Sequence, residues 1–287
     1  MKLLPVFLLL AVLSACPAAS ETPHAVISSG RVNTQGKFSF MYGSVEASIK
    51  APHTANGLWP AFWLLGADYE TSGWPGCGEI DIMEMGGYRG IQAGIQDRYM
   101  TGGCHWGEIL SGNGDANGGG HPNYNLEVQN PVSLQDDFHV YRMVWDGQKI
   151  SMYLDGALYF EMNINVFDGP WPAGDYFNKP FFILFNLAVG GDYPGLYQQS
   201  EISALNSKNN YSAAMYVDYV RVRDEQGNLI WEDDFSGPGL DKSKWNIEVN
   251  DLGGGNRELQ SYRQENVEVG KEPVTGKNCL ILRAAIH

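Results

Sequence analysis

The chain has 287 residues, of which 44% are hydrophobic and 12% aromatic, and its formal net charge is −14 with an isoelectric point near 4.7. This length allows one large all-β domain or two small ones. The negative charge argues against nucleic-acid binding, which depends on neutralising phosphates with Lys and Arg, and it disfavours an anionic polysaccharide as substrate. The 8 Trp and 15 Tyr residues instead suit neutral sugars, whose C–H faces stack on aromatic rings.

The first twenty residues are typical of an export signal. Lys2 supplies the positive charge, and the apolar run at residues 3–13 is too short to span a bilayer. Residues 13–16 (LSAC) resemble a bacterial lipobox, in which Cys16 would become the lipidated N-terminus; ordinary cleavage near Ala19 or Ser20 is the alternative. We expect an exported monomer, either secreted or periplasmic or held in the cell envelope, that meets a membrane only through Cys16.

The rest of the chain reads as strands separated by clusters of Gly, Pro, Asn and Asp, which is typical of a sandwich or barrel. Asp146-Gly147 and Asp155-Gly156 are strong two-residue hairpin signals. The alternation of residues 215–223 predicts that Asp218 and Val220 share a face. We predict one domain, from about residue 24 to residue 287. Its strands are expected at residues 37–50 (two strands around Tyr42-Gly43), 58–65, 138–145, 149–154, 157–160, 180–189 and 215–223.

Three cysteines remain beyond the leader, and an exported protein can form disulfides. Cys77 and Cys104 each lie next to a strand that is expected at the functional site. A bridge between them and two buried free thiols are both compatible with the sequence. With Cys279 the count is odd, so at least one cysteine is unpaired or pairs with another chain.

The segment Gly78-Glu79-Ile80-Asp81-Ile82-Met83-Glu84-Met85 holds three carboxylates separated by strand-forming apolar residues. A glycosidase needs such a density of acid, because two carboxyl groups must flank one glycosidic bond. An edge strand with solvated acids, or a cation site, would show the same alternation. The surrounding tryptophans favour the glycosidase.

The spacing of the acids predicts a break in the strand. Glu79 and Asp81 share a face, but Glu84 is five positions from Glu79 and would point away in a regular strand. A β-bulge at Ile82-Met83 would supply one extra residue and bring Glu84 beside the other two acids. Glu79 and Glu84 could then lie about 5–5.5 Å apart, the separation found in retaining glycosidases.

Four segments before residue 85 together resemble glycoside hydrolase family 16, in its bacterial laminarinase-like branch. The resemblance implies a two-sheet antiparallel β-sandwich, a concanavalin-like jelly roll, with a concave substrate cleft. The extra Met83 agrees with this branch, because the form without a bulge goes with lichenases. The segments are residues 31–38 (RVNTQGKF), 42–46 (YGSVE), 57–63 (GLWPAFW) and 74–84 (WPGCGEIDIME); residues 138–141, 186–191 and 217–221 agree with them.

The resemblance also implies roles for individual side chains. Glu79 would be the nucleophile, Glu84 the general acid/base and Asp81 an assisting carboxylate that tunes both, with retention of the anomeric configuration. For His105, a histidine satisfied by a core carbonyl is an equally open interpretation, and core packing is one for Trp59 and Trp63. The expected substrate-binding residues are Trp59, Trp63, Trp74, Arg31, His105, Asn186 and Asn256, with Trp106 and Trp171 as weaker candidates.

No cofactor is expected for catalysis, but the resemblance implies a structural calcium ion. Asp218 would supply a side-chain ligand, and Asp234 and Asn278, in the turn at residues 276–278, would supply further oxygens. Calcium takes such mixtures of carboxylate and carbonyl oxygens.

The order of the segments departs from the family. Residues 231–245, 255–262 and 279–284 resemble the segments that usually open the domain, yet here they close the chain. We interpret this order as a circular permutation, which is plausible because domain termini often lie close together. A truncated second domain copy is the alternative.

The predicted function is that of a retaining endo-β-glucanase that hydrolyses β-1,3-glucan of the laminarin type, a neutral polysaccharide. A mixed-linkage β-1,3-1,4-glucanase is the near alternative, because loops decide the shape of subsites. A non-catalytic glucan-binding protein on the same sandwich and a transglycosylase are further alternatives.

Overall fold

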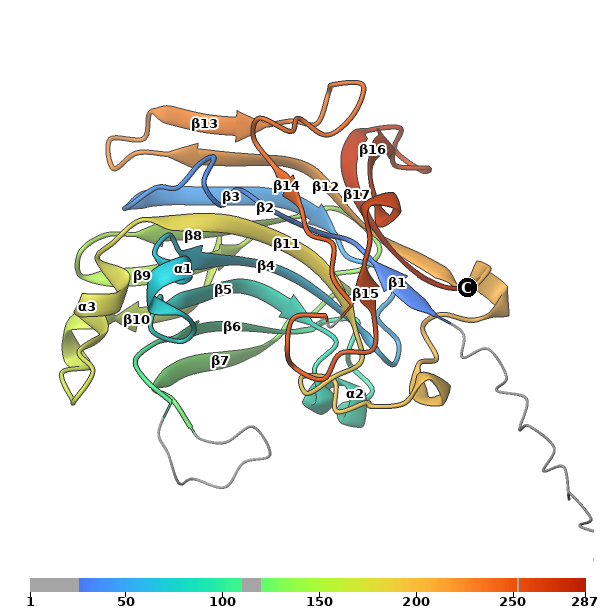
Figure 1. Cartoon of the computed structure of the whole chain (residues 1–287), viewed down its shortest axis with the longest axis horizontal. Coiled ribbons are helices and arrows are strands. Elements are labelled where there is room, and N and C mark those ends of the chain that lie inside the picture. The colour runs from blue at the N-terminus through green and yellow to red at the C-terminus, as the bar shows by residue number, and fades with distance from the viewer. Residues whose placement is uncertain (1–25, 110–119, 252) are drawn as a thin grey trace, which may run out of the picture.

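The computed structural model describes residues 26–109, 120–251 and 253–287. The predicted signal, its Cys16 and the start of the predicted domain lie outside these residues. Two sheets face each other as layers of a sandwich (Figure 1). One has ten strands in the order β10-β9-β8-β3-β12-β17-β1-β15, with β13 beside β12 and β16 beside β17, and we call it sheet A. The other has seven strands in the order β14-β2-β11-β4-β5-β6-β7, and we call it sheet B.

The strands of the two sheets are interleaved along the chain. Sheet A consists of β1 (Ile27–Ser29), β3 (Gly43–Lys50), β8 (His139–Trp145), β9 (Lys149–Leu154), β10 (Ala157–Asn163), β12 (Ser212–Arg223), β13 (Leu229–Asp233), β15 (Ser261–Tyr262), β16 (Val267–Lys271) and β17 (Asn278–Ile286). Sheet B consists of β2 (Arg31–Asn33), β4 (Leu58–Gly66), β5 (Glu79–Met85), β6 (Tyr99–His105), β7 (Asn123–Gln129), β11 (Phe181–Val189) and β14 (Asn246–Ile247). All pairings are antiparallel except that of β1 with β15.

Helices are short and lie in the connections. They are α1 (Tyr69–Ser72), α2 (Tyr88–Ala93), α3 (Ala173–Phe177) and the 3-10 turns η1 (Ile164–Val166), η2 (Gln199–Glu201), η3 (Ser207–Asn209) and η4 (Gln264–Asn266). Within the described ranges, none of them has the length and apolar character that crossing a bilayer would require.

The core fills the space between the sheets, as period-two alternation dictates. Phe62, Ile80 and Phe185 face it from sheet B, and Met143 and Val217 face it from sheet A. The opposite face of sheet B therefore remains for the polar and aromatic side chains of β4, β5 and β11, which build the site. Strand β11 is buried along its whole length, which confirms the prediction for residues 180–189. The β8-β9-β10 meander is confirmed as well.

Three local predictions need correction. Residues 37–41 form only an isolated bridge, from Phe40 to Phe181, before β3 begins. In β12 the register shifts between Val217 and Tyr219, so the buried positions are Met215, Val217, Val220 and Val222. Asp218 and Val220 therefore do not share a face, because a bulge changes the phase of the alternation. The third correction is that one pair of strands is parallel, not antiparallel.

The C-terminal segment is part of the same sandwich. Strand β17 lies between β12 and β1 in sheet A, and β14 pairs with β2 in sheet B (Figure 1). These strands complete the sheets that begin with β1 and β2. Cys77, Cys104 and Cys279 are buried free thiols, so Cys77 and Cys104 are not bridged.

Candidate active site

The register of β5 brings three carboxylates to one face of sheet B. Its neighbour β4 sets Leu65, Trp63 and Ala61 opposite Glu79, Asp81 and Glu84. On its other side β6 sets His105, Gly103 and Thr101 opposite the same three acids. Both neighbours advance by two residues at each step, whereas β5 advances by two and then by three. The surplus residue is absorbed at Ile82-Met83, which confirms the predicted bulge.

Polar groups from elsewhere in the fold satisfy the backbone at this bulge. The hydroxyl of Tyr159, on β10 of the opposite sheet, donates a hydrogen bond to the carbonyl of Ile82. The hydroxyl of Tyr193, after β11, donates to the carbonyl of Glu84 over 3.1 Å. A bulge interrupts the ladder of backbone bonds, so these two tyrosines compensate for the interruption. The sequence had not singled out either residue.

The face that carries the acids is the floor of a cleft of about 510 Å³. Of the expected binding residues, six line the cleft and His105 does not. Trp106 is buried in the core, and neither it nor Trp171 lines the cleft. The lining comprises Glu79, Asp81 and Glu84, the expected Arg31, Trp59, Trp63, Trp74, Asn186 and Asn256, and also Ala61, Leu65, Tyr69, Ile109, His121, Gly254, Gly255 and Glu258.

Burial controls the protonation of the three acids. It raises the pKa of Glu79, Asp81 and Glu84 to about 8 each. After burial, the charge of Asp81 is the next largest cause of this rise in the pKa of the two glutamates, whereas His105 acts against it. Three neighbouring carboxylates in a desolvated cluster cannot all be ionised, so the site holds a proton near neutral pH. A site with one ionised and one protonated carboxyl group can perform both nucleophilic and acid catalysis.

Glu84 is held by donors on both of its oxygens. The indole N–H of Trp59 donates to Oε1 over 2.9 Å, and the hydroxyl of Thr101 donates to Oε2 over 3.2 Å. Both bonds lower the pKa of Glu84 against the effect of burial. The Thr101 hydroxyl also lies 2.9 Å from the hydroxyl of Tyr193. The carboxyl group is therefore fixed in orientation, as a group that exchanges a proton with a bound ligand requires.

Trp63, Asn186 and Arg31 form a second group on the floor of the cleft. The indole N–H of Trp63 donates to Oδ1 of Asn186 over 2.7 Å, and the Arg31 guanidinium lies 5.0 Å from the Trp63 ring centroid. Asn186 is 6% exposed, and its expected need for a partner is met by Trp63. Its NH₂ group can still donate to a ligand.

A turn from the C-terminal part of the chain closes one side of the cleft. The carboxylate of Glu258 accepts hydrogen bonds from the backbone N–H groups of Gly254 and Asn256, over 2.7 and 3.1 Å. A Cβ at position 254 would lie 2.7 Å from Glu258 Oε1, so a larger residue there would displace the Glu258 carboxylate. Glu258 therefore holds the turn that presents Asn256 to the cleft.

His105 lies behind the acids and has a partner that the sequence did not predict. Its Nε2 is 3.4 Å from Oδ2 of Asp81, and its Nδ1 is 2.7 Å from Nε2 of His121. Among the described residues, Glu79, Asp81 and His105 also form the one group of three side chains that could hold a metal ion, with ligand atoms within 4.8 Å. These are the groups that tune the acids, so we assign no metal to them.

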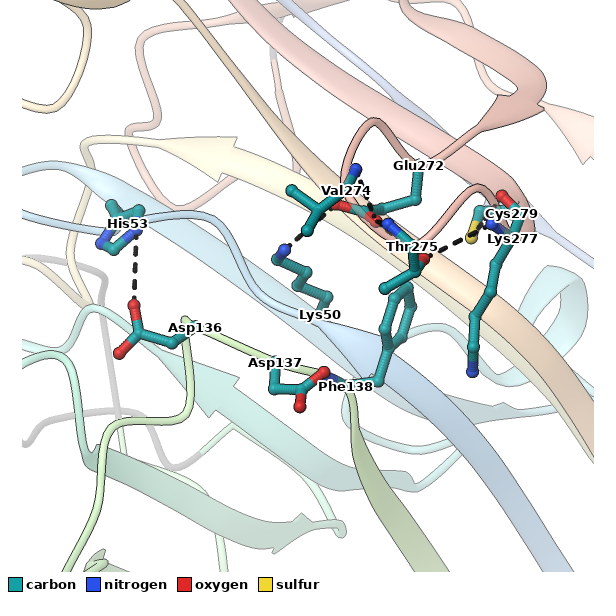
Figure 2. Close-up of polar contacts among 10 residues, drawn as sticks. All are labelled: Lys50, His53, Asp136, Asp137, Phe138, Glu272, Val274, Thr275, Lys277 and Cys279. Atoms are coloured by element: carbon teal, nitrogen blue, oxygen red, sulfur yellow. Dashed lines mark hydrogen bonds and ion pairs between the residues drawn. The ribbon is translucent and has the colours of Figure 1, made fainter.

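The residues expected to bind calcium do not fit such an ion. The ammonium of Lys277 lies 2.5 Å from Oδ2 of Asp218 and 4.8 Å from the ring centroid of Phe138, so a cation already neutralises this carboxylate. Asp234 is exposed and accepts a hydrogen bond from the N–H of Ser236 in its own turn. Figure 2 shows Lys277 beside Phe138 at the turn that precedes Asn278.

Comparisons with known proteins agree with this geometry. The profile described as "Glycosyl hydrolases family 16" matches residues 20–221. A glucan endo-1,3-beta-glucosidase A1 of Niallia circulans is 33% identical over 206 residues, which are 71% of this chain and 27% of that protein. A beta-1,3-glucan-binding protein of Penaeus monodon is 30% identical over 213 residues, which are 69% of this chain and 56% of that protein.

Solved structures agree as well. A Bacteroides ovatus mixed-linkage glucan GH16 protein in complex with a G4G4G3G product is 33% identical, with a TM-score of 0.58 over 69% of this chain and 80% of that chain. The present chain thus matches less than two thirds of the length of each of the two curated relatives.

Proposed function

Since this chain belongs to glycosyl hydrolase family 16, a family of glycoside-cleaving enzymes, we propose that it is a retaining endo-β-glucanase that hydrolyses β-1,3-glucan of the laminarin type. The observation that carries the proposal is the shifted register of β5, which turns Glu84 to the face that already holds Glu79 and Asp81. Without that shift the acid and the nucleophile would lie on opposite faces of sheet B.

In the proposed mechanism Glu84 and Glu79 act on opposite sides of one bond. Glu84 donates its proton to the glycosidic oxygen while the bond from that oxygen to the anomeric carbon breaks, and Glu79 forms an ester bond to the anomeric carbon. Glu84 then takes a proton from water, whose oxygen attacks the anomeric carbon and releases Glu79. Each step inverts the configuration, so the product retains it. Asp81 keeps the proton affinity of both glutamates high through its charge.

The substrate class follows from the lining of the cleft. Trp59, Trp63 and Trp74 offer ring faces for the C–H faces of sugars, and Trp74 is 42% exposed at the rim. Asn186 and Asn256 offer amide groups to hydroxyls. The net charge of −14 also favours a neutral polymer. The glucosidase relative supports a β-1,3-glucan, whereas the Bacteroides ovatus neighbour supports mixed-linkage glucan as the second candidate.

A purely binding function is the alternative from another class, and the Penaeus monodon relative supports it. The retention of Glu79, Asp81 and Glu84, with Glu84 held by two donors, favours catalysis instead. The distinguishing experiment compares E79Q and E84Q on laminarin and on an aryl β-glucoside with a good leaving group. E79Q should lose turnover of both, whereas E84Q should still release the aryl group, because that leaving group needs no acid.

Wild-type protein is assayed on laminarin, lichenan, agarose and carrageenan with analysis of the products. Laminarin cleaved to oligosaccharides of several lengths would support the proposal, and products longer than the substrate would indicate transglycosylation. Turnover of agarose or carrageenan without turnover of either glucan would overturn it.

We also propose that the chain is a circular permutant of the family fold. Ile27 and Ile286 pair in adjacent antiparallel strands, and the N–H of His287 donates to the carbonyl of Val26 over 3.0 Å. These two ends could therefore be joined by a short turn. The family match ends at residue 221, where the order of segments begins to differ, which supports the proposal.

The permutation can be tested by reversing it. A variant that links His287 to Val26 and opens the chain within the turn Asp224–Asn228 should fold and keep its activity, because every strand pairing survives. Failure of this variant to fold, together with a stable wild-type domain, would contradict the proposal.

A further inference from the structure

A chain of three polar side chains leads from the catalytic carboxylates to the rim of the cleft. It runs from Oδ2 of Asp81 to Nε2 of His105 over 3.4 Å, and from Nδ1 of His105 to Nε2 of His121 over 2.7 Å. Asp81 lies on β5 and His105 on β6, while His121 lies two residues before β7. The contact between the two histidines thus joins a strand of the floor to a segment of the rim.

Asp81, at the buried end of this series of side chains, needs a hydrogen-bond donor. Asp81 is 5% exposed, and its Oδ2 has no hydrogen-bond partner among the described residues. A buried carboxylate oxygen without a donor is costly. The Nε2 atom of His105, at 3.4 Å, is the ring nitrogen that lies nearest to this oxygen and could carry the donor.

The tautomer of His105 decides whether it can donate. In a neutral imidazole only one nitrogen carries a proton, so a proton on Nε2 leaves Nδ1 as an acceptor. The Nδ1 atom then needs a donor, and Nε2 of His121 lies 2.7 Å away. The hydrogen bond that one ring nitrogen makes therefore decides whether the other nitrogen carries the proton.

His121 is itself held in place at the rim. Its ring lies at a steep angle to that of Trp74 in a T-shaped contact, with centroids 4.6 Å apart, and both residues line the cleft. The same imidazole thus contacts a proposed sugar platform on one side and the partner of Asp81 on the other.

We propose that His121 is a positioning residue: it donates to Nδ1 of His105 and so holds His105 as the tautomer whose Nε2–H faces Asp81. A hydrogen bond from His105 favours the ionised form of Asp81. The charge of Asp81 keeps the proton on Glu84 until the glycosidic oxygen takes it. This inference rests on the proposed hydrolytic function, but the tautomer of His105 can be measured without any turnover.

The test combines nitrogen-15 NMR of the histidine rings with steady-state kinetics on laminarin. Three variants are compared with wild type. H121A removes the donor, H121Q replaces it with a side-chain amide that can also donate, and H53Q is the matched control. His53 is exposed, does not line the cleft and pairs with Asp136 (Figure 2).

In the wild type we expect His105 to carry its proton on Nε2. In H121A that signal should change to the other tautomer or to a mixture, and kcat should fall about tenfold, a part of the 10²–10⁴-fold that general acid–base catalysis contributes. KM should change less than kcat. H121Q should restore both the tautomer and most of kcat, and H53Q should match the wild type.

Several results would overturn the proposal. A proton on Nδ1 of His105 in the wild type, or on both nitrogens, would reverse the direction of donation. An unchanged tautomer in H121A would show that His121 does not position His105. A rise in KM with kcat intact would make His121 a sugar ligand only. A wild type that is inactive on every glucan would contradict the hydrolytic function, while the NMR result would still stand.

Discussion

The indole of Trp59 donates a hydrogen bond to Oε1 of Glu84 over 2.9 Å, while the same ring stacks on Tyr193 with centroids 5.0 Å apart. One side chain thus both orients the proposed acid and forms part of the cleft wall. These two roles can be separated by substitution.

W59F keeps an aromatic ring but removes the donor. Since the bond from Trp59 lowers the pKa of Glu84, its loss should raise that pKa, and the basic limb of the kcat/KM profile should move to higher pH. The ionised form of Glu84 is then less available as a base, so kcat should fall about tenfold. T101V, which removes the donor to Oε2, should shift the profile in the same direction. A basic limb that moves to lower pH in W59F would contradict this assignment.

Deletion of Met83 should leave a folded variant able to hydrolyse glucan. Without the surplus residue Glu84 stands four positions from Glu79, and residues four apart in a regular strand share a face, so all three acids stay in the cleft without a bulge. The matched control is M83A, which keeps the residue count. Because Met83 is fully buried, M83A should lose about 2–5 kcal/mol in the free energy of unfolding, measured with urea, yet remain active. A folded deletion variant that is inactive while M83A is active would show that the bulge does more than restore the phase of the strand.

Glu272 should make the fold sensitive to acid. Its carboxylate is 2% exposed and accepts hydrogen bonds from Lys50 over 3.0 Å and from the N–H and hydroxyl of Thr275 over 2.6 and 2.7 Å (Figure 2). These bonds lower the pKa of Glu272 to about 2, from a usual 4.5. A lowered pKa stabilises the fold above pH 4.5, and this contribution is lost as the pH falls from 4.5 toward 2.

The variant E272Q tests this linkage. The free energy of unfolding of E272Q should be roughly 3 kcal/mol lower than that of the wild type at neutral pH, because Lys50 is left without its charged partner. The difference from wild type should shrink as the pH approaches 2, when Glu272 itself is protonated. Urea denaturation at several pH values measures the free energy of unfolding of the wild type and of E272Q. A difference that is constant with pH would show that the charge of Glu272 does not stabilise the fold.

Chelation of calcium should leave the stability unchanged. Lys277 already neutralises Asp218, so EDTA and added CaCl₂ should give the same Tm. K277M removes the ammonium and should lower the free energy of unfolding by about 1 kcal/mol. This is the usual contribution of a partly exposed ion pair with a cation–π contact. K208M, at an exposed lysine in η3, is the control. A Tm of the wild type that rises with CaCl₂ would favour a bound calcium ion instead.

The sequence alone determined the parts of this protein that depend on local periodicity. The count of residues between Glu79 and Glu84 was enough to predict the bulge, because the phase of a strand is a property of consecutive residues. The same reasoning failed at Asp218 in β12, where no functional residue marked the change of phase. The hairpins of the meander were predicted for the same local reason, from their Asp-Gly turns.

Only the tertiary structure decided which distant residues meet. His121 reaches His105, Trp63 meets Asn186, and Lys277 meets Asp218 because the sheets bring these segments together. None of these pairs has a signal in the residue spacing, since contact across strands depends on sheet order and on loop paths. The local pattern thus determined that three acids share one face of a strand, and the folded contacts decided how these acids are held and charged.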